Sequence, residues 1–286
     1  MSYPELCRGD KGEAVRHLQS CLNRVGAMLI ADGEFGRGTE RGVRYAQDIA
    51  GLPDTGTADE ALWSWLICQP EPFPQLGTDG VAFIAAKETG GLGYYQQVTR
   101  WPHFPGYHSG ITLGVGYDLR FATESEFKAL WEPLLPAPAI AALSLDLGRK
   151  GSKSRAQALK GLGIEVPFQV AWRVFLDHTL PKFYAATNTL YPTLEHLPPL
   201  CRSALVSIVF NRGTSLSGPS RLEMRTIGDL LTEADNAAYH KQKRKVILAD
   251  IEDQILAMQR LWGPDSGLYL RRQAEANLWR NGLDQW

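Results

Sequence analysis

Residues Ser109–Arg120 read SGITLGVGYDLR, a strand-like stretch that contains three glycines: Gly110, Gly114 and Gly116. Alternating apolar and β-branched residues favour a β-strand, and glycines inside a strand often mark the close approach of a ligand or another backbone. The stretch also carries one hydroxyl, Thr112, and one carboxylate, Asp118, six residues apart. The pattern predicts a strand with an extended polymer lying across it and two polar groups beside that polymer.

A helix is predicted upstream, where GVAFIAAKETGG (residues 80–91) spaces its apolar residues as a helix does. Gly90 and Gly91 end this helix, and Glu88 falls in its last turn. A carboxyl group beside apolar residues, at the negative end of a helix dipole, tends to keep its proton. A general acid needs that property, although a solvated glutamate at a helix end shows the same pattern.

The chain after Ala122 has the apolar spacing of helices in most of its length, for example in LPPLCRSALVSIVFNRG (residues 197–213). A short glycine-rich β-region followed by helices is an α+β layout that is mostly helical. We therefore expect a small β-region and a helical lobe in the larger part of the chain.

The front of the chain reads as three short helices joined by Gly/Asp turns. Their segments are EAVRHLQSCLNRV (13–25), TERGVRYAQDIA (39–50) and ADEALWSWL (58–66). Pro70, Pro72 and Pro74 then disfavour helix and keep the backbone extended. The sequence predicts a three-helix domain over residues 1–68, a proline-rich linker over 69–79 and a larger domain over 80–286.

The front segment resembles the peptidoglycan-binding module of bacterial and phage cell-wall hydrolases. The motif residues that match are Asp32, Gly33, Phe35, Tyr45 and Gln47, together with Gly36, Thr39, Val43, Gly51, Leu52, Pro53 and Gly56. Capping residues and turn glycines in any three-helix bundle offer an ordinary alternative for part of this pattern. The resemblance implies a module that binds peptidoglycan.

Four segments of the larger part resemble the phage-type lysozyme superfamily. They are E-x-G at Glu88–Gly90, G-x-T-x-G-x-G-Y at Gly110–Tyr117, A-L-x-S-x-x-F-N-x-G at Ala204–Gly213 and G-L-x-x-R-R-x-x-E-x-x-L-W at Gly267–Trp279. Many phage lysozymes carry a second acid six residues before the strand threonine, which here is Gly106. Asp118 stands six residues after Thr112 instead, as in the pesticin-like lysozymes. The resemblance implies a lysozyme-like domain.

The same resemblance implies the site. Glu88 acts as the acid, and Thr112 and Asp118 hold the attacking water. The residues expected to contact substrate are Tyr117, Asn211, Arg271, Tyr107 and Tyr94, with Arg271 and Arg272 placing a guanidinium near Glu88 and Trp101 as a further stacking platform. Surface ion pairs for the arginines, a helix cap for the asparagine and core packing for the aromatics are the ordinary alternatives.

These residues together predict a peptidoglycan hydrolase, an N-acetylmuramidase that cuts the β-1,4 bond between N-acetylmuramic acid and N-acetylglucosamine. A lytic transglycosylase and a non-catalytic wall-binding protein are the two alternatives. A phage endolysin released through a holin and an antibacterial effector with an immunity protein both fit. We expect a monomer without cofactor or metal, because the six histidines lack the spacing of metal motifs.

Composition excludes some classes of protein. The net charge is −1, with 7 basic and 11 acidic residues in the first 75, so a nucleic-acid binder is not expected. No apolar run suits membrane insertion, and the first residues lack a signal-peptide pattern. We expect synthesis in the cytoplasm and action on the wall in the periplasm after release or injection. The four cysteines are expected to be buried thiols, with a Cys7–Cys68 disulfide as the alternative.

Overall fold

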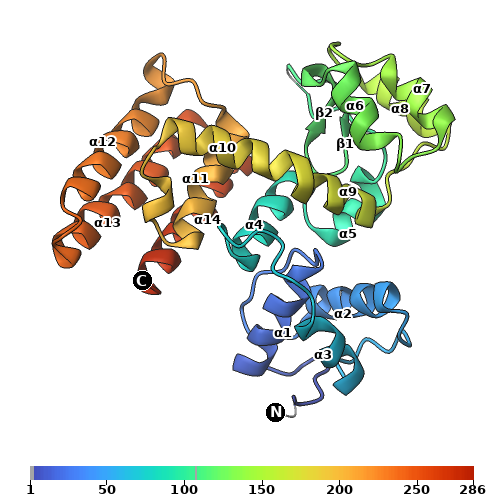
Figure 1. Ribbon diagram of the computed structural model, residues 1–286, viewed down its shortest axis with the longest axis horizontal. Helices are drawn as coiled ribbons and strands as arrows, with labels where there is room; N and C mark the ends of the chain where they lie inside the picture. The colour runs from blue at the N-terminus through green and yellow to red at the C-terminus, as the bar shows by residue number, and fades with distance from the viewer. Residues whose placement is uncertain (1–2, 107) are drawn as a thin grey trace. The chain divides into compact units, whose positions relative to one another are not determined.

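The computed structural model describes residues 3–106 and 108–286. These residues are mostly helical and contain one two-stranded sheet (Figure 1). The chain forms two compact units: unit 1 comprises Met1–Gln69 and Ala85–Pro181, and unit 2 comprises Pro70–Ile84 and Lys182–Trp286. The helices α4 (Thr78–Thr89) and α10 (Leu180–Leu190) each contribute residues to both units.

Unit 1 begins with the three predicted helices, α1 (Glu13–Arg24), α2 (Arg37–Ala50) and α3 (Glu60–Ile67), which are confirmed. Apolar residues on their inner faces build one core around Leu18, Leu22 and Trp63. Three buried side-chain amides hold the connecting loops, those of Gln19, Asn23 and Gln47. Because each amide satisfies backbone groups that would otherwise be buried without partners, these loops are part of the folded core.

The rest of unit 1 is a series of short elements around a hairpin (Figure 1). After α4 come α5 (Leu92–Tyr94), a π-helical turn (Tyr95–Thr99), β1 (Thr112–Leu113), β2 (Tyr117–Asp118), a 3-10 turn (Leu119–Phe121), α6 (Glu124–Trp131), α7 (Ala137–Ser144), α8 (Lys153–Gly161), α9 (Phe168–Val174) and a second π-helical turn (Phe175–Thr179). Strands β1 and β2 are antiparallel. The single strand predicted over Ser109–Arg120 is therefore wrong.

The chain reverses within this stretch because the residues between the two strands include Gly114 and Gly116, at φ 54° and 76°. L-residues with a side chain rarely adopt positive φ, and glycine does so without steric penalty. Gly114 and Gly116, two of the three glycines that suggested a thin strand, therefore form the turn of a hairpin.

The three front helices pack directly on the rest of unit 1. The ring of Tyr45 contacts Phe168 edge-on, with 5.6 Å between ring centroids. A Cβ added to Gly26 would lie 2.8 Å from the same phenylalanine ring. These contacts join the front helices to α9 in one compact unit.

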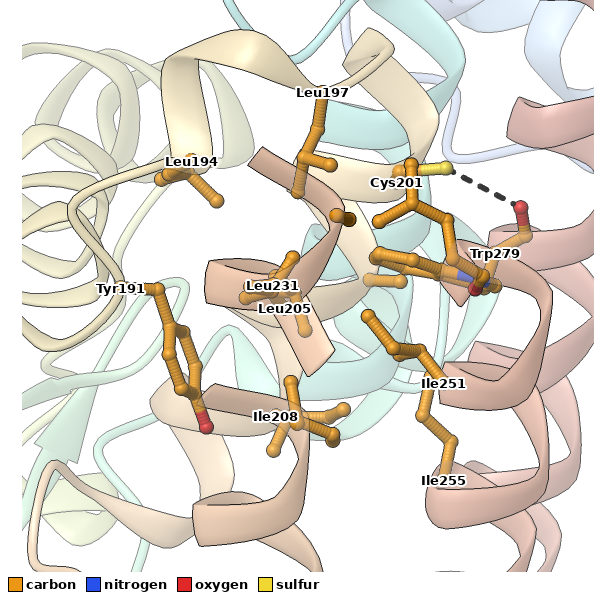
Figure 2. Close-up of a cluster of buried hydrophobic side chains, with 14 of the residues drawn as sticks. Tyr191, Leu194, Leu197, Cys201, Leu205, Ile208, Leu231, Ile251, Ile255 and Trp279 are labelled. Carbon is orange, nitrogen blue, oxygen red and sulfur yellow. Dashed lines mark hydrogen bonds between the residues drawn. The ribbon is translucent and has the colours of Figure 1, made fainter. Parts of the chain in front are cut away.

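Unit 2 is a helical lobe. Its main helices are α10, α11 (Pro199–Arg212), α12 (Leu222–Asn236), α13 (Lys241–Ala257) and α14 (Gly267–Asp284), joined by 3-10 turns at Leu194–His196, Pro219–Arg221 and Met258–Leu261. Figure 2 shows the core between them, where Leu205, Ile251 and Trp279 converge. The thiol of Cys201 donates to the Trp279 carbonyl oxygen at 3.3 Å, which ties α11 to α14. The mostly helical character predicted for this part of the chain is confirmed.

The cysteines differ in exposure. Burial raises the pKa of the Cys201 thiol, which therefore stays protonated and inert. Cys21 is also buried, whereas Cys7 and Cys68 are exposed free thiols. The prediction of buried thiols is correct for two of the four cysteines. None of the helices in the described ranges is both long and apolar enough to span a membrane.

Candidate functional site

The hairpin brings Thr112 and Asp118 together. They are direct partners across the two strands, and Leu113 pairs with Tyr117. Because side chains alternate along a strand, the first pair occupies one face of the hairpin and the second pair the opposite face. Thr112 is only 5% exposed. The hairpin thus presents a hydroxyl and a carboxylate side by side.

Asp118 also has a structural part in this hairpin. Its Oδ1 accepts hydrogen bonds from the backbone N–H groups of Gly110 and Arg120, both at 2.9 Å, and Oδ2 accepts from Gly110 at 3.1 Å. Burial raises the pKa of Asp118, and these hydrogen bonds oppose part of that rise. A carboxylate with a raised pKa is a better proton acceptor, so the same group can clamp the loop and serve as a base.

Gly110 and Gly114 are required by the packing of the protein itself. A Cβ on Gly110 would lie 2.5 Å from Asp118 Oδ1, and one on Gly114 would lie 2.9 Å from the Ala171 Cβ. Both distances are too short for a real side chain. The expectation that the glycines leave space for a polymer is therefore corrected for Gly110 and Gly114, which let one part of unit 1 approach another.

Glu88 lies in the last turn of α4, in unit 1, and is partly exposed. Thr89 and the two glycines after it end the helix, since the Gly91 N–H donates to Thr89 Oγ1 at 3.2 Å. The ring of Tyr94 covers Gly90, and Tyr94 itself is 52% exposed. The helix end therefore carries an acid and an exposed aromatic ring six residues apart.

The side chain of Tyr117 does not lie on the hairpin face that carries Thr112 and Asp118. It points into the core from the other face of the hairpin and is 5% exposed. Its ring contacts Trp131 edge-on at 5.4 Å and lies 5.8 Å from the His178 ring. Tyr117 is therefore a core residue, as the alternative expected. Tyr107, also predicted to contact substrate, lies outside the described residues.

The remaining predicted contacts belong to unit 2. Arg271 is 6% exposed, and its guanidinium donates to Glu275 at 3.0 Å and to the Ser207 hydroxyl at 3.1 Å. Arg272 is fully buried and binds the same carboxylate. A surface ion pair, the ordinary alternative for these arginines, is therefore wrong. Asn211 is exposed at the end of α11.

Sequence reasoning did not assign a role to Glu275. Its side chain is fully buried and accepts hydrogen bonds from Ser207, Arg271 and Arg272. The signal was present, because a glutamate three and four residues after two arginines lies on their helix face. A buried carboxylate needs such partners, so this group holds α14 against α11.

The motif residues of the front helices mainly maintain the fold. Phe35 and Gln47 are almost fully buried, and Gln47 bonds to Thr55, to the Thr57 carbonyl oxygen and to the Gly56 N–H. Exposed Asp32 accepts from the amide of Gln19 at 2.8 Å, and buried Gly33 has φ 79°. Tyr45 is partly buried against Phe168. Within the described residues, no three His, Cys, Asp or Glu side chains gather as a metal site requires.

Comparison with known families matches residues 11–66 to the peptidoglycan binding domain. The match covers α1, α2 and α3 with the loops that the buried amides hold. Comparison with curated proteins gives no significant match. Residues 11–66 therefore form a peptidoglycan-binding module. This module supports peptidoglycan as a binding partner of the protein.

Proposed function

We propose that the protein is a peptidoglycan hydrolase, an N-acetylmuramidase. The observation that carries the proposal is the Thr112–Asp118 pair, a hydroxyl and a carboxylate on one hairpin face, in the same compact unit as a peptidoglycan-binding module. Glu88 lies in that unit as well, at a helix end. Two carboxyl groups are what cleavage of a glycosidic bond needs.

In the proposed reaction Glu88 donates its proton to the glycosidic oxygen as the bond to the anomeric carbon breaks. Thr112 orients a water molecule on the opposite face of the sugar, because a hydroxyl both donates and accepts hydrogen bonds. Asp118 takes a proton from that water as its oxygen attacks the anomeric carbon. Water and leaving group act on opposite faces, so the configuration at this carbon inverts.

Mass spectrometry of muropeptides tests the proposal. The protein is incubated with purified sacculi, and the released fragments are expected to end in reducing N-acetylmuramic acid. The Glu88→Gln variant is expected to release less than about 1% as much per unit time, because an amide cannot donate the proton and acid catalysis commonly contributes 10²–10⁴-fold. The matched control, Glu132→Gln, replaces an exposed glutamate of the same unit and should release fragments at the normal rate.

The products also separate the alternatives. Fragments ending in 1,6-anhydro sugars would assign a lytic transglycosylase. Binding to sacculi without any release would assign a non-catalytic wall-binding protein, an outcome with some structural support because Asp118 already accepts hydrogen bonds from two backbone amides. Normal release by Glu88→Gln would remove Glu88 from the mechanism.

A further inference from the structure

Unit 1 contains a cavity of about 300 Å³ between one face of α8 and the chain formed by the first π-helical turn and the segment after it. Aromatic rings, side-chain amides and two lysines line it, among them Gln97, Trp101, Phe104, Lys153, Gln157 and Lys160. Lys153, Gln157 and Lys160 come from one helix face, since they are spaced by four and three residues. The cavity is therefore built by a regular element and not by a loop alone.

The cavity is positively charged. Lys160 Nζ is held 5.2 Å from the centre of the Trp101 ring, which fixes its position without neutralising it. No ion pair joins Lys153 or Lys160 to a carboxylate among the described residues, and no Asp or Glu lines the cavity. Burial lowers the pKa of His103, also in the lining, so this ring is neutral at pH 7. Two cations thus face the cavity without an internal counter-ion.

The cavity is attached to the hairpin at two points. His103 of its lining exchanges backbone hydrogen bonds with Thr112, at 2.8 and 3.1 Å. Two residues before α8, the Gly151 N–H donates to the Ser109 carbonyl oxygen at 3.0 Å. A Cβ on Gly151 would lie 2.6 Å from the Gly110 carbonyl carbon, so the backbones touch. A ligand in the cavity would consequently be held in a fixed position relative to Thr112 and Asp118.

We propose that this cavity binds a carboxylate of the acidic stem peptide of peptidoglycan. The inference rests on the proposed function, because it gives the same substrate a second contact beside the hairpin. The lactyl-linked peptide of peptidoglycan is the part of that polymer that carries carboxylates, whereas its sugars are uncharged. Lys153 and Lys160 bind the carboxylate, Gln97 and Gln157 supply donors and acceptors for peptide groups, and Phe104 contacts the apolar part of the peptide.

Nuclear magnetic resonance of the full chain tests the binding without requiring catalysis. The probe is the tripeptide L-alanyl-γ-D-glutamyl-meso-diaminopimelate, and the readout is the indole N–H signal of Trp101, assigned through its loss in Trp101→Phe. The signal is expected to shift in a saturable way with the tripeptide. It should shift much less with the same tripeptide whose carboxylates are amidated.

Two double variants locate the site. Lys153→Ala/Lys160→Ala is expected to weaken tripeptide binding by about tenfold or more, since one partly exposed ion pair commonly contributes up to about fivefold. Lys150→Ala/Lys243→Ala removes the same net charge from exposed positions outside the cavity and should leave binding unchanged. Equal losses in both double variants, or no shift of the Trp101 signal in the unaltered chain, would overturn the inference.

The outcome is separable from that of the proposed function. A chain that cuts sacculi but shows no tripeptide-dependent shift keeps the hydrolase proposal and loses the stem-peptide site. A chain that binds the tripeptide through Lys153 and Lys160 but releases no muropeptides keeps the site and loses the hydrolase proposal.

Discussion

Thr112 and Asp118 are direct partners across an antiparallel hairpin, six positions apart along the chain. Opposed residues of such a pair have Cβ atoms about 4.5–5.5 Å apart and project to the same side. A hydroxyl and a carboxylate at that spacing can bind one water molecule between them. Asp118 is held further by the Gly110 and Arg120 amides, so its orientation is set before any ligand arrives.

Substitution of this pair should affect the rate unequally. Asp118→Asn is expected to slow hydrolysis of soluble wall fragments by about 10²–10⁴-fold, because an amide cannot take the proton of the water. Thr112→Ser keeps the hydroxyl and should lose less than about tenfold. Steady-state kinetics with both variants measures this. The fresh product should be the α-anomer by NMR; an early β-anomer would instead mean that a carboxylate attacks the sugar.

The pH dependence of activity and of stability should reflect the ionisation of Asp118. Burial raises its pKa above the usual 3.8, and a base must be ionised, so activity should be lost as pH falls through a value higher than 3.8. The folded chain holds this proton more tightly than the unfolded chain, so the free energy of unfolding should decrease as pH rises from 3.8 to the raised pKa. The pH profile of kcat/KM tests the loss of activity, and the pH profile of the melting temperature tests the change in stability. Asp118→Asn should remove the pH dependence of stability over this range.

Gly110→Ala should destabilise unit 1. The new methyl group would lie 2.5 Å from Asp118 Oδ1 and 2.7 Å from the Arg120 nitrogen, and such crowding costs about 1–3 kcal/mol. Gly161→Ala is the matched control, because it adds the same methyl group in α8 with no atom within 4 Å. Thermal unfolding of both variants is the measurement. Equal stability of the two variants would mean that the loop yields without strain.

Gln47→Leu should unfold the loop that its amide holds. The leucine fills similar space but leaves the buried Gly56 N–H and Thr57 carbonyl oxygen without their partner, at a cost of about 1–3 kcal/mol. Binding to sacculi should weaken with the loss of the module's fold, measured by co-sedimentation beside thermal unfolding. Gln96→Leu, at an exposed position, should change neither quantity. Normal binding by Gln47→Leu would place the wall contact away from this loop.

Deletion of residues 1–68 should expose apolar surface. The ring of Phe168 packs against Tyr45, and its partner surface would be removed with the module. We expect the remaining chain to melt at a lower temperature and to bind a hydrophobic dye, and to act more slowly on sacculi because it has lost its tether. Tyr45→Ala in the full chain should reproduce part of the destabilisation, about 2 kcal/mol. Unchanged melting of the shortened chain would show that the module folds and acts independently.

The sequence alone determined most of the helices and the module. The 3.6-residue spacing of apolar side chains is a local property, so α1, α2 and α3 could be located from it, as could α11 and α14. Turn glycines and helix ends are also local, which is why Glu88 falls where expected, in the last turn of α4. The peptidoglycan-binding motif could be read for the same reason, since its buried amides and glycines act on loops close to them in the chain.

Only the tertiary structure decided what the polar and glycine positions between those elements do. An apolar stretch with glycines can form either one strand or a hairpin, and its composition does not distinguish the two. The outcome depends on the backbone that the stretch contacts: Gly114 packs against Ala171, 57 residues away. Partners distant in the chain likewise decide which face Tyr117 occupies, how deeply Arg271 is buried and how Tyr45 packs on Phe168. Burial and hydrogen bonding between such residues are set when the core closes, because the free energy of a polar or aromatic side chain depends on its final neighbours and not on its neighbours in sequence.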